Sequence, residues 1–200
     1  MQKVWIKLAM FLAVALVFQS IRLIMPMIPG PVNMFLIGSL LNTVMVLSIW
    51  CTDSPWAAVI GILLPLGAFM QGQLPVVLMI PVVALGNAVY ILLVGKFKRS
   101  KLVYASPLVK AVLLYGGTWL VVNTIGLPPP VSGMILFMMS WPQIVTGAIG
   151  LFLANKVYKY LDSIRLSGKV VDCLLMGSRS SLCLNINQPA RSKPLCWQKN

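Results

Sequence analysis

The sequence predicts an all-α integral membrane protein with six transmembrane helices and both termini in the cytoplasm. The first reason is composition: 59% of the residues are hydrophobic and 10% are charged, whereas a soluble domain is about one quarter charged. The second is that the apolar residues form long runs, each close to the roughly 20 residues that cross a bilayer as a helix. The third is the placement of the basic residues, which lie almost entirely in alternate loops.

Six apolar segments follow one another along the chain. We expect helices over residues 4–24, 33–50, 55–71, 75–95, 102–124 and 132–157. The third segment is short and contains Gly61 and Pro65, so it either crosses the membrane or enters it and returns beside the fourth. Residues 1–165 therefore form the predicted membrane domain.

The composition changes after Arg165. Residues 166–200 are rich in Ser, Asn and basic residues and contain a single short apolar patch, "VVDCLL". Because this composition offers little apolar surface to bury, we expect a disordered cytoplasmic tail. The alternative is that the apolar patch lies on the membrane surface.

The orientation follows from the basic residues, because Lys and Arg close to a span are retained on the cytoplasmic side. The segments assigned to the cytoplasm contain Lys3, Lys7, Lys96, Lys98, Arg99, Lys101, Lys156, Lys159 and Arg165. The segments assigned to the outside contain only Arg22. This distribution explains most of the net charge of +13, and we expect no nucleic-acid partner because the basic residues form no patch with interleaved aromatic residues.

Two basic residues lie close to or within the predicted spans. Lys110 is about two turns into the fifth segment, and we expect its side chain to extend back to the cytoplasmic interface. Arg22 ends the first segment. Its guanidinium group either reaches lipid headgroups or pairs with a carboxylate or phosphate of a ligand.

Several kinds of chemistry lack their usual residues. The chain has neither Glu nor His, and its acidic residues, Asp53, Asp162 and Asp172, fall in or beyond loops. Acid–base catalysis and proton relay inside a membrane need ionisable groups there, so we expect no enzyme activity. The sequence has no Gly-rich phosphate loop, so another subunit would have to supply energy for transport.

We also expect no metal site and no cofactor. The cysteines, Cys51, Cys173, Cys183 and Cys196, are widely spaced and have no His to complete a zinc site. All of them fall on the predicted cytoplasmic side, where thiols remain reduced.

Polar side chains within the predicted spans are mostly amides, hydroxyls and tryptophans. They include Asn33, Asn42, Asn87, Thr118, Trp119, Asn123, Ser140, Trp141 and Gln143. An amide in hydrocarbon needs a partner, so these side chains face either neighbouring helices or a polar cavity. Gln71 and Gln73 in the outer loop "QGQLP" and Asn123 near the outer end of the fifth segment favour a pocket that opens outward.

The candidate substrate-binding residues combine these amides with the outer basic residue and one tryptophan. They are Arg22, Asn33, Gln71, Gln73, Asn87, Trp119, Asn123 and Gln143. Because no acidic residue falls inside a predicted span, a strongly cationic ligand would lack a counter-charge. A neutral or anionic metabolite is favoured.

The sixth segment carries a small-residue face. Gln143, Gly147, Gly150 and Ala154 recur at helical spacing, which permits close approach of another helix. Pro142 frees a backbone carbonyl group, which either kinks the helix or contacts a ligand.

The beginning of the chain carries the residues of a family resemblance. Ala9 and Ala13 in "LAMFLAVAL" form a small-residue stripe, and "IPGPVNMFLIGSLLN" contains a Pro/Gly loop before Asn33. With six spans and both termini inside, residues 1–165 resemble the substrate-binding S components of energy-coupling factor (ECF) transporters.

The resemblance implies a role for each of these segments. Ala9 and Ala13 would dock on a transmembrane coupling subunit, and Pro29, Gly30 and Pro31 would belong to a lid. Paired ATPase subunits would drive uptake of a vitamin or similar micronutrient. The alternative is a non-transporting six-span scaffold, such as the rod-shape-determining membrane proteins, which explains the predicted topology equally well.

Overall fold

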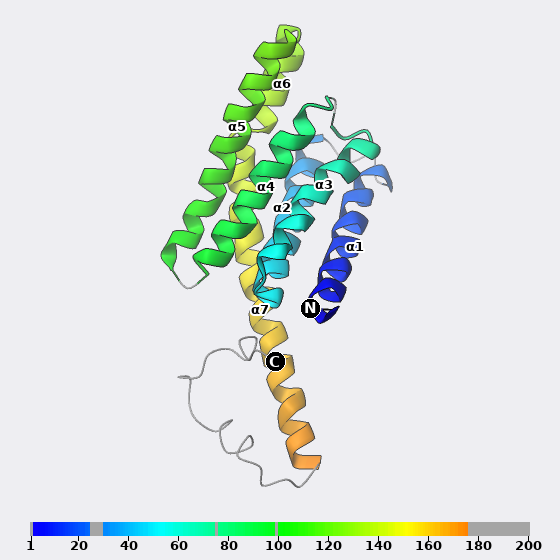
Figure 1. The fold of residues 1–200 in the computed structure, drawn as a ribbon, viewed down its shortest axis with the longest axis vertical. Helices are drawn as coiled ribbons and strands as arrows, with labels where there is room; N and C mark the ends of the chain where they lie inside the picture. The colour runs from blue at the N-terminus through cyan, green and yellow to red at the C-terminus, as the bar shows by residue number, and fades with distance from the viewer. Residues whose placement is uncertain (1, 25–29, 75, 99, 176–200) are drawn as a thin grey trace. The chain divides into compact units, whose positions relative to one another are not determined.

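The computed structural model describes residues 2–24, 30–74, 76–98 and 100–175. The chain divides into two compact units, Met1–Ala154 and Asn155–Asn200. All regular secondary structure in the described residues is helical, as the composition predicts (Figure 1).

The described residues of the first unit contain six α-helices and the beginning of a seventh. The helices are α1 (Gln2–Ile24), α2 (Gly30–Thr52), α3 (Ala58–Met70), α4 (Met79–Lys96), α5 (Ser106–Ile125), α6 (Pro129–Met138) and α7 (Trp141–Leu175). Short 3-10 helices, Pro55–Ala57 and Lys101–Ala105, precede α3 and α5.

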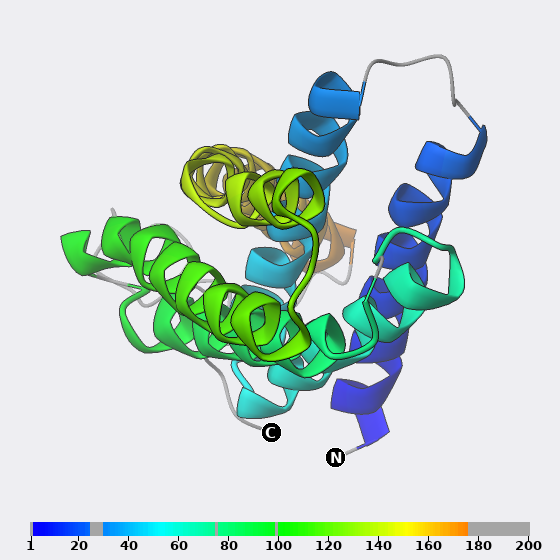
Figure 2. The same ribbon diagram turned by 90° about the horizontal axis from the view of Figure 1, so that it is seen from above.

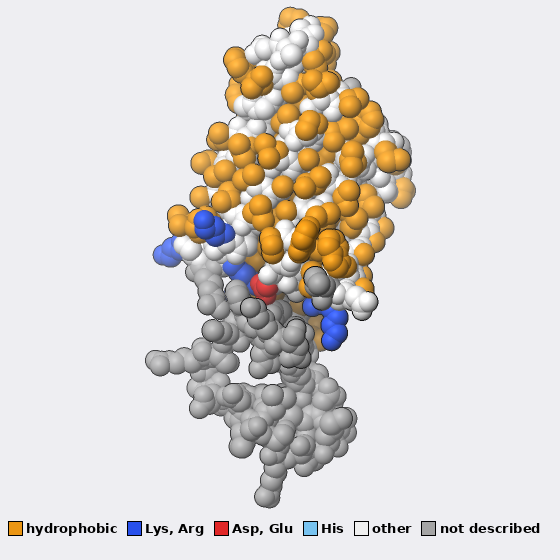
Figure 3. All heavy atoms as spheres, in the orientation of Figure 1, with side chains coloured by type: hydrophobic (Ala, Val, Ile, Leu, Met, Phe, Trp, Pro, Cys, Tyr) orange, Lys and Arg blue, Asp and Glu red, His pale blue; other side chains and the backbone are white. Residues whose placement is uncertain are grey.

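Within the part of the chain that the structure describes, five helical segments are long and apolar enough to cross a membrane, which indicates a multi-pass membrane protein. They are Gln2–Ile24, Val32–Thr52, Met79–Lys96, Lys101–Ile125 and Pro129–Ile164. The third predicted segment is a shorter apolar helical stretch, Pro55–Met70. Apolar side chains cover the face of the first unit seen in Figure 3, where Lys and Arg gather at one end.

Successive helices from α1 to α5 run in alternate directions, and each packs on the next or the next but one. The closest neighbours are α3 with α4, α1 with α2, and α4 with α5 (Figures 1 and 2). Helix α2 is the most buried of the five long segments and lies between α1 and α4. The end of α1, the beginning of α2 and the connections α3–α4 and α5–α6 therefore lie at the same end of the bundle, which we call the loop end.

The helix predicted over residues 132–157 is divided into α6 and α7. The division lies at Met139 and Ser140, and Pro142 is the second residue of α7. A proline inside a helix has no N–H to donate and clashes with the carbonyl group four residues earlier, here that of Met138. The Gln143 side chain donates to the Met138 carbonyl oxygen at 3.2 Å, which replaces the missing backbone bond.

The small-residue face of α7 packs inside the first unit. A Cβ atom added to Gly150 would lie 2.6 Å from Cβ of Asn42 and 3.1 Å from the α2 backbone. One added to Gly147 would lie 2.7 Å from Pro107. Ala154 is fully buried. Close helix packing is thus the role of this face, because it brings α7 against α2 and the beginning of α5.

In the second unit, Asn155–Asn200, the described residues continue α7 to Leu175. The helix thus passes the predicted boundary at residue 165. Residues 176–200, the larger part of the predicted disordered tail, lie outside the described residues.

Candidate functional site

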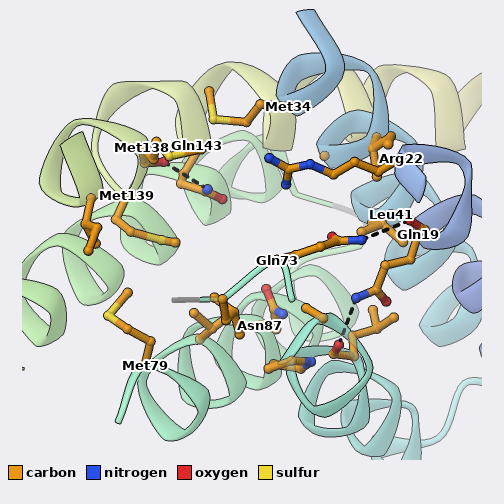
Figure 4. A pocket seen from close by; sticks show the side chains of 18 of the residues that line it. Gln19, Arg22, Met34, Leu41, Gln73, Met79, Asn87, Met138, Met139 and Gln143 are labelled. Carbon is orange, nitrogen blue, oxygen red and sulfur yellow. Dashed lines mark hydrogen bonds between the residues drawn. The ribbon is translucent and has the colours of Figure 1, made fainter. Parts of the chain in front are cut away.

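A cavity of about 680 Å³ lies between the helices of the first unit (Figure 4). Every helix from α1 to α7, together with the α3–α4 loop, contributes to its wall. Its lining includes amides from five of these elements: Gln19, Asn33, Asn42, Gln73, Asn87 and Gln143. Arg22 and Lys110 add positive charge, and the described lining residues include no Asp or Glu.

The cavity extends deep along α2. Its lining on this helix runs from Asn33, near the helix start, to Met45. At 1.5 Å per residue this corresponds to roughly 18 Å along the helix axis. Because α1 and α5 run in the same direction, Arg22 near the end of α1 lies at the loop end of the cavity. Lys110, near the beginning of α5, lies at the opposite, deep end (Figure 1).

Lys110 does not extend back to the interface, contrary to the expectation from sequence. Its side chain is buried, with 3% of the residue exposed, and Nζ donates to Oδ1 of Asn42 at 2.7 Å. Nζ also lies 5.0 Å from the centre of the Tyr90 ring. Snorkelling is unnecessary because Asn42 and the ring stabilise the ammonium group inside the bundle.

Asn42 connects this lysine to α7. Its Nδ2 donates to Oγ1 of Thr146 at 3.3 Å, while its Oδ1 accepts from Lys110. Tyr90 from α4 donates from its hydroxyl group to the Gly147 carbonyl oxygen at 3.1 Å. Four helices, α2, α4, α5 and α7, therefore fix the position of the Lys110 ammonium group.

Two of the lining amides donate to carbonyl groups that prolines leave free. Pro65 in α3 cannot donate to Gly61, and Nδ2 of Asn87 lies 3.5 Å from the Gly61 carbonyl oxygen. Gln143 acts in the same way at Pro142. These side chains stabilise irregular helices at the cavity wall and also line the cavity.

At the loop end, a network of amides connects α1 with the loop after α3. Nε2 of Gln73 donates to the Gln19 carbonyl oxygen at 3.1 Å and to Oε1 of Gln71 at 2.7 Å. Nε2 of Gln71 donates to Oγ of Ser20 at 3.2 Å. The Gln73 and Arg22 side chains extend into the cavity in Figure 4. The network therefore braces the cavity wall at the loop end.

Two buried acceptors on the cavity lining have no hydrogen-bond donor among the described residues. They are Oε1 of Gln19 and Oδ1 of Asn33. Leaving such an acceptor unpaired in an apolar region costs about 1–3 kcal/mol. A ligand with a hydrogen-bond donor would satisfy either of them.

Methionines form much of the apolar wall. Met34, Met45, Met79, Met134, Met138 and Met139 line the cavity. A methionine side chain is unbranched and polarisable, so it adapts to apolar surfaces of different shapes.

The structure brings five of the eight candidate binding residues to the cavity: Arg22, Asn33, Gln73, Asn87 and Gln143. Gln71 is outside the lining and contacts it through Gln73. Trp119, with 55% exposure, and Asn123 lie on the exposed surface of α5 and do not line the cavity.

The other candidate residues lie at the beginning of the chain. Pro29 is outside the described residues, and Gly30 and Pro31 begin α2. Ala9 and Ala13 are exposed on α1.

Gln19, Asn42 and Lys110 were missed as candidate binding residues. For Gln19 a signal was present, because it lies one turn before Arg22 and so shares its face of α1. Asn42 was recognised as a buried amide, but nothing in the sequence distinguished a cavity from a helix contact. For Lys110 the distance to the span end favoured the interface, and only the position of Asn42 on another helix explains its burial.

The chain matches no family model, no curated protein and no solved structure. The fold and the cavity define the class of protein: a multi-pass, all-α membrane protein with a cavity between its helices.

Proposed function

We propose that this chain is the substrate-binding membrane subunit of a multi-subunit, ATP-driven uptake transporter, with a vitamin or similar small neutral or anionic micronutrient as ligand. The cavity is the observation that supports this function best. Its volume of about 680 Å³ falls in the range of about 300–1,000 Å³ typical of small-molecule sites, and its wall combines apolar residues with a few polar groups.

The proposed direction of transport rests on the two ends of the bundle. Lys3 and Lys7 at the beginning of α1 lie at the same end as Lys96, Lys98 and Lys101 between α4 and α5. If this basic end faces the cytoplasm, the loop end, with Arg22 and the amide network, faces the outside. A ligand then enters from outside, under a lid formed by Pro29, Gly30 and Pro31.

The proposed partners are a transmembrane coupling subunit and paired ATPases, since the sequence contains no phosphate-binding loop of its own. The exposed stripe of Ala9 and Ala13 supports the docking role. The residues of α1 that pack inward are Leu8, Ala15 and Gln19, so the alanine stripe is not part of the buried face. Two small side chains one turn apart would let another membrane helix approach closely. The chain itself is not an enzyme in this proposal.

The experiment that tests this function separates binding from docking. Cells that contain the coupling subunit and its ATPases should take up the ligand, and Ala9→Trp with Ala13→Trp should abolish uptake while the purified protein still retains ligand in native mass spectrometry. Because both positions are exposed, the double variant should fold normally. A matched control is Val14→Trp, at an exposed position of the same helix that lies off the stripe because it is one residue after Ala13 and five after Ala9.

Three results would contradict the proposal in different ways. Normal uptake by the double variant removes the docking role. Uptake by the wild-type chain alone in vesicles removes the need for a partner. If no small molecule binds and no uptake occurs, the six-span scaffold becomes the better assignment.

A further inference from the structure

The deep end of the cavity contains a basic side chain beside which no described acidic side chain lies. Lys110 is buried, and among the described residues its hydrogen-bond acceptor is the neutral amide of Asn42. Asp53, an acidic residue of the first unit, pairs instead with Lys98, with 3.1 Å between Nζ and Oδ1. A buried ammonium group without a counter-ion is costly, so an anion in the cavity would stabilise the protonated form of Lys110 and pair with it.

The ammonium group also has unused hydrogen-bonding capacity. A lysine has three N–H donors, and the bond to Asn42 uses one of them. The Tyr90 ring covers the group at 5.0 Å but accepts no conventional hydrogen bond. Since Lys110 itself lines the cavity, a ligand atom that enters the deep end can reach the remaining donors.

The loop end adds a second cation. Arg22 extends into the cavity there, and the described lining contributes no acidic residue between it and Lys110 (Figure 4). A narrow space with cations and low-dielectric walls concentrates anions and excludes cations. Together the two charges favour entry of an anion and its passage to the deep end.

The wall between the two cations is mostly apolar. Methionines from α2, α4 and α6, and Met139 after α6, line this part of the cavity. Such a wall stabilises a bound apolar molecule but contributes little binding free energy to a small, strongly hydrated inorganic anion. The ligand therefore needs an apolar body as well as its charge.

We propose that the ligand of this cavity is an organic carboxylate with an apolar body, and that its carboxylate group binds Nζ of Lys110 at the deep end. A carboxylate suits this end better than a phosphate, because one ammonium group and neutral amides balance a single negative charge. This inference rests on the proposed ligand-binding function and narrows the neutral or anionic ligand to an organic acid.

The test compares acids with their uncharged amides on the purified full-length chain in detergent micelles. The probes are decanoate, 4-phenylbutyrate and 6-phenylhexanoate, each beside its primary amide at pH 7. Binding is followed by the ligand-dependent rise in melting temperature and by isothermal titration calorimetry. A charge-assisted hydrogen bond in a shielded site should make at least one acid bind about 10- to 100-fold more tightly than its amide.

Two variants assign this preference to Lys110. Lys110→Met removes the charge at similar side-chain length, and Lys110→Gln removes it while keeping a donor for Asn42. Both should lose the preference for acids. Lys101→Met is the control, because it removes a charge at an exposed position outside the cavity and should keep the preference. The comparison of acid with amide on the wild-type chain needs no variant, so it stands if both Lys110 variants unfold.

Each outcome separates this inference from the proposed function. Acid and amide binding equally, or a preference that survives in Lys110→Gln, overturns the carboxylate assignment and leaves ligand binding intact. Binding of the amides without the acids likewise overturns the carboxylate assignment and leaves ligand binding intact. If no probe binds while native mass spectrometry of the purified chain shows a neutral bound molecule, the carboxylate assignment fails and the transporter function stands. If neither probe nor copurified molecule binds, both fail.

Discussion

At the scale of single residues, the buried amides have two tasks that the sequence does not separate. Asn87 and Gln143 line the cavity, and each also donates to a carbonyl group that a proline leaves without its helical partner. Asn42 instead accepts from Lys110. Each of these polar side chains thus forms a hydrogen bond with a group, on its own or a neighbouring helix, that otherwise lacks a partner.

The first prediction tests the task of Gln143 at the break between α6 and α7. Gln143→Leu should lower the free energy of unfolding by about 1–3 kcal/mol, because the Met138 carbonyl oxygen loses its donor. In a Pro142→Ala background the backbone N–H of residue 142 can supply that donor, so the cost of Gln143→Leu should shrink. Reversible unfolding in mixed micelles of all four variants gives the coupling energy. If Gln143→Leu lowers the free energy of unfolding equally in the wild-type and in the Pro142→Ala background, Gln143 does not replace the bond that Pro142 removes.

The second prediction separates residues that line the cavity from an amide that does not. Arg22→Ala and Gln73→Leu should each weaken ligand binding about tenfold, because each removes a polar group from the cavity lining. Asn123→Leu should leave affinity unchanged, since Asn123 is exposed on α5. Calorimetric titration of the three purified variants provides the check, and a loss confined to Asn123→Leu would place the site elsewhere.

At the scale of helices, the close packing of α7 on α2 and of α3 on α4 places the polar residues of the cavity next to one another. Gly150 on α7 allows the α2 backbone and Asn42 to lie against it, and Asn42 in turn holds Lys110 of α5. Gly61 on α3 has the same role against α4, where an added Cβ atom would lie 3.1 Å from the backbone at Asn87 and Ala88. The small residues therefore determine which polar side chains meet.

The third prediction concerns this approach of α7 to α2. Gly150→Ala should destabilise the protein by about 1–3 kcal/mol, since the new methyl group overlaps Asn42 and the α2 backbone. It should also weaken binding of an anionic ligand by displacing Asn42. Gly116→Ala is the control, because open space surrounds that position on α5, and it should be neutral or slightly stabilising. Thermal unfolding of both variants measures this difference. Equal stability of Gly150→Ala and Gly116→Ala would show that α7 is not closely packed at Gly150.

At the scale of the whole first unit, the two ends of the helical bundle differ in charge. Lysines gather where α1 begins and where α4 connects to α5, and Lys98 there also donates to the Trp50 carbonyl oxygen at 3.0 Å, near the end of α2. The other end holds Arg22 and the neutral amide network. This asymmetry predicts which end faces the cytoplasm.

The fourth prediction tests that orientation by cysteine labelling in a background without native cysteines. Val77→Cys, beside the outer "QGQLP" loop, should react with a membrane-impermeant maleimide on intact cells. Lys101→Cys, in the basic connection between α4 and α5, should react only after permeabilisation. Both positions are exposed, so neither change should disturb the fold. The reverse pattern would place the cavity entrance on the cytoplasmic side and contradict the uptake model.

The sequence by itself determined the class of the fold and the approximate position of its helices. Length and apolarity are local properties of the chain, and a bilayer requires long apolar helices whatever their neighbours. The shortness of the third segment is also a local property, so the sequence showed it as well. The amides and Arg22 were visible as candidates, but their spacing along the chain did not show which of them meet.

Only the tertiary structure decided which polar residues share one site. The burial of Lys110 depends on Asn42, which is 68 positions away in sequence. Trp119 and Asn123 resembled the other candidates in sequence, yet the rotation of α5 about its axis leaves them on its outer surface. Helix rotation and close packing depend on contacts between distant segments, and the energy of a buried charge depends on what those contacts place beside it.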